Sequence, residues 1–148
     1  MIKVQKNDFN VNDEIKVITS KNSNIGGISS FIGIVREGKK NTLKSMTLEH
    51  YPGMTEKMLQ KIDLEAQKRW DLTETKIIHR YGKLLPGDQI VLVITASEHR
   101  KNAIKSCEFL IDWLKTKAPF WKLEHTTDGK KWVDERQSDL DATSKWSG

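Results

Sequence analysis

A proline near the C-terminal end separates two elements, and this break restricts the fold more than any other feature. Residues 101–117 have the apolar spacing of a long helix. Pro119 ends this helix, because its ring removes the backbone N–H that an α-helix uses. Residues 120–125 then restart as an aromatic strand. We expect Lys115 and Lys122 to flank this sharp corner, where side chains from two rigid elements can converge on one pocket.

Two interpretations of these lysines are open from the residues alone. A lysine beside Phe120, Trp121 or Trp113 would lose part of its hydration. Desolvation lowers the pKa of a lysine and frees its amine to act as a base or a nucleophile. The alternative is that both lysines extend from packed elements into water, as most lysines do.

Strand and helix patterns alternate through the rest of the chain. A helix is expected after Asn10, its N-cap, and another after the Pro52-Gly53 break. Further strands are expected at 2–5, 28–35, 43–51, 75–81, 89–95 and 131–133. The second helix is expected to bury Met54, Met58, Leu59, Ile62, Ala66 and Trp70, and the third Ala103, Ile104, Cys107, Leu110, Ile111 and Leu114. This mixture favours an α+β domain with helices packed on a largely antiparallel sheet.

Composition narrows the range of chemistry. A chain of 148 residues is expected to be one domain, here with the polar residues 134–148 as a C-terminal arm. Cys107 is the single cysteine, which excludes an intramolecular disulfide, and its place on an apolar helix face predicts a buried, unreactive thiol. We expect a cytoplasmic protein outside the membrane, because no leader opens the chain and no apolar run approaches the ~20 residues of a membrane helix.

The motifs of several large enzyme classes are missing. The histidines show no HxxxH spacing and there is no CxxC pair, so we expect no metal site. Gly-rich phosphate loops and a GxSxG elbow are also absent from the sequence, so we expect no nucleotide cofactor and no serine-hydrolase chemistry.

Two basic segments are candidate anion sites. The segment 97–100 (Ser-Glu-His-Arg) precedes a helix, whose backbone amides would bind an anion together with His99 and Arg100. Arg36 follows a strand at the edge of a loop and is a second candidate. The alternative in both cases is an ordinary solvated charge. The net charge of +5 permits anionic partners but is spread among acidic residues.

Six short segments, in this order and at these spacings, carry a family resemblance. They are FIGIVR at 31–36, LEHYPGM at 48–54, HRYG at 79–82, PGD at 86–88, SEHR at 97–100 and LKTKAPFWK at 114–122. Over roughly residues 28–139 the chain resembles the large (catalytic) subunits of molybdopterin synthase, the MoaE family. The chain departs from the family at Gly26-Gly27, where the family tends to carry Gly-Ala, and in the loop after Arg36.

The resemblance implies an α/β hammerhead fold with an additional antiparallel β subdomain. It implies a sulfurtransferase that installs the two dithiolene sulfurs of molybdopterin on cyclic pyranopterin monophosphate, in molybdenum cofactor biosynthesis. The sulfur donor would be the thiocarboxylated C-terminal Gly-Gly tail of a small ubiquitin-like subunit. The expected assembly is a heterotetramer around a homodimer of this chain, with no cofactor.

The resemblance also implies roles for individual residues. Lys115 and Lys122 are the expected catalytic pair: one is an acid/base or an amine nucleophile at the thiocarboxylate, the other stabilises negative charge. The substrate phosphate is expected to bind Arg36, His99 and Arg100. The remaining expected site residues are Ile34, Val35, Leu123 and Glu124 on the pocket wall, and Arg136 from a neighbouring protomer.

Two other functions are open. A nucleic-acid-binding module would use the positive charge and would stack bases on Trp121 and Trp132, although these aromatics have the apolar sequence context of a core. A non-catalytic scaffold would dock a ubiquitin-like protein without chemistry.

Overall fold

Eight strands and three helices make up the residues that the computed structural model describes, namely 1–38, 42–133, 144 and 146. The helices are α1 (Val11–Lys21), α2 (Met54–Arg69) and α3 (Arg100–Thr116). The strands are β1 (Ile2–Gln5), β2 (Gly27–Ile34), β3 (Leu43–His50), β4 (Glu74–Arg80), β5 (Gly82–Leu84), β6 (Gln89–Ser97), β7 (Phe120–Thr126) and β8 (Gly129–Trp132). The predicted α+β class is confirmed.

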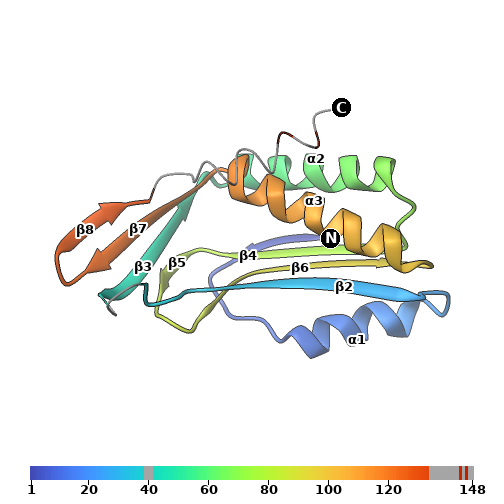
Figure 1. The fold of residues 1–148 in the computed structure, drawn as a ribbon, viewed down its shortest axis with the longest axis horizontal. Helices are drawn as coiled ribbons and strands as arrows, with labels where there is room; N and C mark the ends of the chain where they lie inside the picture. Colours follow the sequence, from blue (N-terminus) through green and yellow to red (C-terminus); the bar gives the residue numbers. More distant parts are fainter. Residues whose placement is uncertain (39–41, 134–143, 145, 147–148) are drawn as a thin grey trace.

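The first sheet has the strand order β1-β4-β6-β2 and is covered on both faces. Its strands are antiparallel except for the parallel pair β1 and β4. Figure 1 shows α1 below this sheet, with α2 and α3 above it. Because helices cover both faces, the strand β6 is buried from Ile90 to Ser97, and its sequence is apolar without interruption from Ile90 to Ile94.

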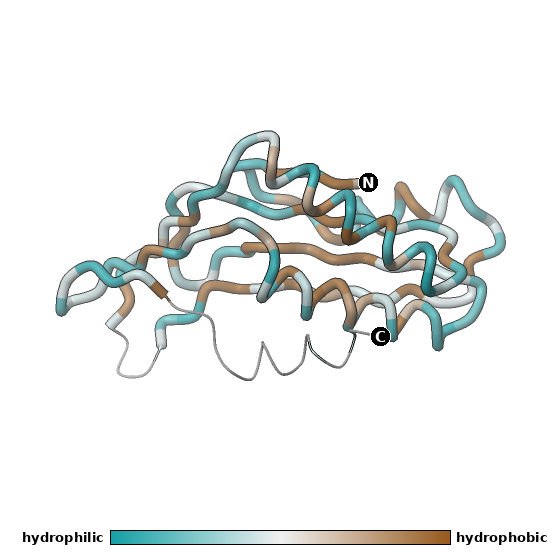
Figure 2. The backbone as a smooth tube through the Cα atoms, turned by 90° about the horizontal axis from the view of Figure 1, so that it is seen from above, coloured by the Kyte–Doolittle hydropathy of each residue, from teal (hydrophilic) through white to brown (hydrophobic). Residues whose placement is uncertain are grey.

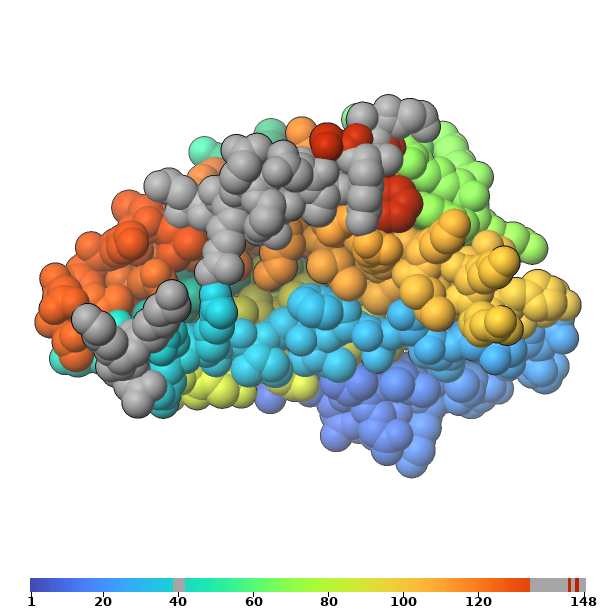
Figure 3. All heavy atoms as spheres, viewed as in Figure 1, coloured from blue at the N-terminus to red at the C-terminus, as the bar shows by residue number. Residues whose placement is uncertain are grey.

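The second sheet has the order β5-β3-β7-β8, is antiparallel throughout, and forms the expected additional subdomain. It lies at one end of the molecule, with β7 and β8 furthest out (Figures 1 and 3). A hairpin joins β7 to β8 at the Asp128-Gly129 pair, and Gly129 provides the positive φ of 114° at its end. One hydrophobic core connects the two sheets through Val35, Leu48, Leu84, Phe109 and Leu110.

The predicted N-cap of the first helix is confirmed. The side chain of Asn10 caps α1 by accepting a hydrogen bond from the N–H of Asp13 at 3.0 Å. Gly33 lies at a β-bulge, where a Cβ would come within 2.7 Å of Val91. Hydrophobic residues are concentrated along the strands in the middle of the molecule, and hydrophilic residues along the outer helix turns (Figure 2).

The predicted buried faces of two helices are partly wrong. Met54 in α2 is 57% exposed, and Ile104 in α3 is 56% exposed. A stripe that recurs every four residues rotates by about 40° at each step of a 3.6-residue helix, so its first member leaves the core side. The buried face of α2 is instead made of Thr55, Leu59, Ile62, Asp63 and Ala66.

Part of the predicted polar arm packs against the body of the protein. Of residues 134–148, the structure describes Ser144 and Trp146. The Trp146 ring contacts the rings of Trp70 and Phe109, with centroids 5.8 Å and 5.6 Å away. Its indole N–H donates to Oδ2 of Asp112 at 2.6 Å.

Candidate active site

The helix-to-strand corner that Pro119 predicts is present between α3 and β7. The helix ends where the N–H of Lys117 donates to the carbonyl of Trp113 at 2.7 Å, and β7 begins at Phe120. Lys115 therefore lies in the last turn of α3, where the helix dipole favours a positive charge. Lys122 is the third residue of β7.

Lys122 lies on the face of β7 that turns toward the core. In the pairing of β3 with β7 it is opposite Leu48, whose side chain is 1% exposed. Residues directly opposite in an antiparallel pair share one face of the sheet, so Lys122 extends from a buried surface and is itself partly buried. Lys115 is exposed, so at this lysine the structure agrees with the second interpretation, a side chain that extends into water.

A buried histidine that the sequence analysis left out of the site stacks on the first residue of β7. His79 in β4 is 5% exposed, and its ring stacks on the ring of Phe120 at a centroid distance of 3.6 Å and an angle of 12°. Its Nδ1 lies 2.8 Å from the carbonyl oxygen of Arg80. The only sequence signal for this position was its inclusion in the HRYG segment at 79–82.

The pKa of His79 reflects its burial and the charges of both lysines. Burial is the main reason that the pKa of His79 falls from 6.5 to about 3, against the opposing effect of the hydrogen bond to Arg80. The positive charges of Lys122 and Lys115 lower the pKa further, and so does His50. Charges act more strongly at shorter range, so one imidazole is within the electrostatic reach of lysines from two different elements.

The end of β2 brings Arg36 to the same end of the molecule. A turn at residues 85–88 holds this strand end, because the N–H of Val35 donates to the Asp88 carbonyl at 2.9 Å and the Val35 carbonyl accepts from Gly87 at 2.7 Å. Val35 is 2% exposed, whereas Ile34 is 48% exposed and Arg36 is exposed. With its N–H already bound, Val35 mainly fixes the point at which Arg36 leaves the sheet.

The two residues after Lys122 lie on different faces of β7. Glu124 is opposite Met46 and shares the face of Lys122, whereas Leu123 is opposite Thr47 on the other face. Both side chains are partly buried. Glu124 therefore shares the face of Lys122, and Leu123 lies on the opposite face.

His99 and Arg100 lie at the far end of α3 from the lysines. His99 is the N-cap and Arg100 the first residue of this helix, which runs back over the sheet toward β7 (Figure 1). At roughly 1.5 Å per residue, Arg100 and Lys115 are about 22 Å apart along the helix axis. The pairing of β2 with β6 separates Arg36 in the same way, because Gly27 pairs with Ser97 at one end and Ile34 with Gln89 at the other. One protomer does not bring Arg36, His99 and Arg100 together.

Trp121 and Trp132 are exposed, so the expectation that they are core residues is wrong. Their exposed fractions are 41% and 53%. Trp121 faces away from the core because it alternates with Phe120 and Lys122, and its ring meets that of Tyr51 edge-on at 4.7 Å. Trp132 belongs to β8, the edge strand of the second sheet.

The remaining expectations concern a thiol, metals and a membrane. Cys107 is 3% exposed, and burial raises the pKa of its thiol, as predicted.

Within the described ranges, no group of three or more His, Cys, Asp or Glu is placed to hold a metal ion. No helix in the described part of the chain is long and apolar enough to cross a membrane. Arg136 lies outside the described residues.

Comparisons with known proteins identify the family of this chain. A family model described as MoaE protein matches residues 4–117. The chain is 49% identical over 146 residues to the molybdopterin synthase catalytic subunit of Ralstonia nicotianae, covering 98% of this chain and 83% of that protein. Its identity to the Vibrio cholerae protein of the same name is 47%, covering 98% and 97%. The solved structure of the molybdopterin biosynthesis MoaE protein from Burkholderia ambifaria matches with a TM-score of 0.86 and 48% identity, covering 100% of this chain and 98% of that one. The chain therefore belongs to the MoaE family.

Proposed function

We propose that this chain is the catalytic subunit of a molybdopterin synthase. In this proposal it transfers two sulfurs from the thiocarboxylated C-terminus of a small ubiquitin-like subunit to cyclic pyranopterin monophosphate. The dithiolene of molybdopterin is the product. Relatives that cover 98% of the chain at 47–49% identity carry the name molybdopterin synthase catalytic subunit, which supports the assignment.

The observation that carries the proposal is the pair of amines at the corner of α3 and β7. Lys115 and Lys122 come from different elements, and the charges of both act on one buried imidazole. A thiocarboxylate tail that entered this corner would place its acyl carbon beside two ammonium groups. One lysine would stabilise the charge that develops on the acyl oxygen, and the other would act as acid/base or attack the acyl carbon.

The source of sulfur lies outside the chain in this proposal. Cys107 is the single cysteine of the sequence, and its thiol is buried within α3. Burial raises the pKa of this thiol, which keeps it protonated and poorly nucleophilic. An external carrier that presents sulfur on a flexible tail satisfies both facts.

The separation of Arg36 from His99 and Arg100 supports a site completed by a second copy of the chain. In a two-fold dimer, the start of α3 in one protomer can meet the lysine end of α3 in the other. We therefore propose that Arg36 binds the pterin phosphate together with His99 of the partner subunit and Arg100 of the partner subunit. Ile34 and Glu124 would line the same pocket, and the proposed contribution of Arg136 would also come from across the dimer.

A reconstituted reaction tests the function. The wild-type chain is mixed with the thiocarboxylated small subunit and cyclic pyranopterin monophosphate, and molybdopterin is measured by conversion to a fluorescent derivative. We expect product in proportion to the thiocarboxylate consumed. A tight complex without product would support the scaffold instead. Steeply salt-dependent binding of RNA or DNA, again without product, would support a nucleic-acid module that uses the exposed Trp121 and Trp132.

Mixed dimers test the shared site. Arg100→Ala and Lys122→Ala are expected to be nearly inactive alone when the pterin is below its KM. Random mixing of the two leaves one intact site in half of the dimers, so about a quarter of wild-type activity should return. Activity that stays at the level of the separate variants would place both residues in one protomer's site and contradict this arrangement.

A further inference from the structure

His79 is a buried polar side chain that the proposed chemistry does not yet use. Alternation along β4 places Ile77 and His79 on the face toward α2 and α3, and Ile78 on the face toward α1. His79 is the last residue of that series, at the end of the sheet where β7 begins. A polar ring at a position otherwise occupied by core residues needs a specific partner.

The hydrogen bond of His79 fixes which nitrogen carries the proton. The carbonyl oxygen of Arg80 accepts hydrogen bonds and cannot donate, so the Nδ1 that lies 2.8 Å away is the protonated nitrogen. This hydrogen bond ties the plane of the ring to the backbone of β4.

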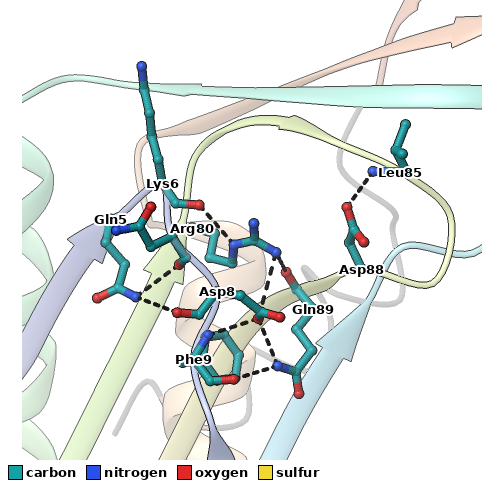
Figure 4. Close-up of polar contacts among 9 residues, drawn as sticks. Gln5, Lys6, Asp8, Phe9, Arg80, Leu85, Asp88 and Gln89 are labelled. Atoms are coloured by element: carbon teal, nitrogen blue, oxygen red, sulfur yellow. Dashed lines mark hydrogen bonds and ion pairs between the residues drawn. The ribbon is translucent and has the colours of Figure 1, made fainter.

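The backbone of β4 is itself held at this point. Arg80 donates from Nε to the Lys6 carbonyl at 3.0 Å and from Nη1 to the Gln89 carbonyl at 2.9 Å, and its guanidinium lies 3.7 Å from Asp8. Figure 4 shows Arg80 between the segment that follows β1 and the start of β6. Gln89 completes the cluster by donating to Asp8 and to the Phe9 carbonyl, both at 2.8 Å. The carbonyl that orients His79 therefore belongs to a residue whose side chain is held by two hydrogen bonds and an ion pair.

Phe120 links the fixed ring of His79 to β7, the strand that carries Lys122. Its ring lies on His79 and also contacts His50, with centroids 5.9 Å apart. His50 is fixed in turn, because its Nδ1 lies 3.0 Å from Oγ1 of Thr55, and that hydroxyl donates to the Tyr51 carbonyl. Phe120 precedes Lys122 by two residues on the same face of β7. The start of the strand is thus held between two oriented rings.

We propose that His79 is a positioning residue of this site: its ring, oriented by the Arg80 carbonyl, holds Phe120 and through it sets the place of the Lys122 amine without adding a charge. The proposal rests on the sulfur-transfer function proposed above. The groups that face His79 are Lys115 from α3, Lys122 from β7 and His50 from β3. Burial of the ring, with a smaller contribution from these neighbouring groups, keeps its pKa near 3, so the imidazole is neutral when the enzyme works.

Two substitutions separate the stacking from the polarity. His79→Phe keeps an aromatic face against Phe120, whereas His79→Ala removes it. Ile78→Ala is the matched control, because Ile78 is the adjacent residue, is 1% exposed and faces α1. We expect His79→Ala to lower the kcat of sulfur transfer at least about tenfold with KM changed less than about twofold, His79→Phe to keep kcat within about threefold, and Ile78→Ala to keep it unchanged.

A second readout follows the lysine itself. After reductive methylation of the lysines, the NMR signal of Lys122 should shift or broaden in His79→Ala and stay near its wild-type position in His79→Phe and Ile78→Ala. If His79→Ala does not fold, His79→Leu fills the space without an aromatic face and takes its place. A kcat and a Lys122 signal in His79→Ala that match those of Ile78→Ala would overturn the proposal, as would a loss in His79→Phe equal to that in His79→Ala. If the wild-type chain transfers no sulfur, the proposed function fails, and the Lys122 signal still decides whether His79 positions this amine.

Discussion

Acid should destabilise this protein through one identifiable group, the buried imidazole of His79. Its pKa is about 3 in the folded chain and about 6.5 in the unfolded chain. Between these values the unfolded chain binds this proton and the folded chain does not. The stability that comes from a neutral His79 is therefore fully present above pH 6.5 and is lost as the pH falls toward 3.

The size of the loss in stability follows from the shift in the pKa of His79. Each pH unit in this window costs about 1.4 kcal/mol, so the loss at pH 4.5 is about 2.7 kcal/mol relative to pH 7.5. His79→Phe removes the titration and keeps the stacked ring. The difference in free energy of unfolding, wild type minus variant, should therefore fall by about 2.7 kcal/mol between pH 7.5 and pH 4.5.

Urea unfolding followed by tryptophan fluorescence measures this difference at each pH. Carboxylates also titrate in acid, including Asp8, whose pKa is lowered mainly by its hydrogen bond with Gln89. These groups are present in both chains and cancel in the comparison. A difference that stays constant from pH 7.5 to 4.5 would refute the burial of a neutral imidazole at this position.

Three further predictions concern the scaffold and the source of sulfur. Gly26→Ala should lower the free energy of unfolding by about 1–3 kcal/mol in urea unfolding, because the new Cβ would lie 2.0 Å from the Glu98 carbonyl oxygen. Glu14→Gln should lower it by about 3 kcal/mol, because the ammonium of Lys76, with 8% of its side chain exposed, would lose its charged partner. Cys107→Ala should leave kcat of the reconstituted reaction unchanged; a loss of turnover with the fold intact would mean that the chain's own thiol takes part.

Local sequence rules were sufficient for the three helices, for the strands other than β5 (Gly82–Leu84) and for the corner. Pro119 marks the end of α3, the side chain of Asn10 marks the start of α1, and the Asp128-Gly129 pair marks the hairpin. Each of these signals acts over a few residues, so it survives in any fold that keeps the element. The family resemblance, carried by six short segments in order along the chain, predicted the second sheet and is confirmed by the comparisons.

Contacts between distant segments were beyond the reach of the same rules. His79 and Phe120 belong to different sheets, and no periodicity in either strand predicts that their rings stack. Trp121 was expected in the core from its apolar neighbours, but the period of two in β7 turns it to the opposite face from Lys122.

The predicted phosphate site of Arg36, His99 and Arg100 likewise depends on contacts that sequence rules do not reach. Arg36 and Arg100 each flank a strand of the first sheet, and the sequence gives no reason to separate them. The antiparallel pairing of β2 with β6 sends the two residues to opposite ends of the sheet. A phosphate site that contains both arginines then requires a second copy of the chain. Local sequence patterns do not predict such an assembly.

Single-turnover sulfur transfer by three lysine variants tests the central claim most directly. Lys115→Ala and Lys122→Ala remove the two amines beside His79, and Lys117→Ala removes the neighbouring lysine, whose ammonium lies 5.5 Å from the centre of the Trp113 ring. With thiocarboxylated small subunit and pterin in excess, we expect the first two variants to bind the small subunit normally and form almost no molybdopterin, while Lys117→Ala reacts at the wild-type rate. Near-wild-type rates in both Lys115→Ala and Lys122→Ala would contradict the proposed role of this corner.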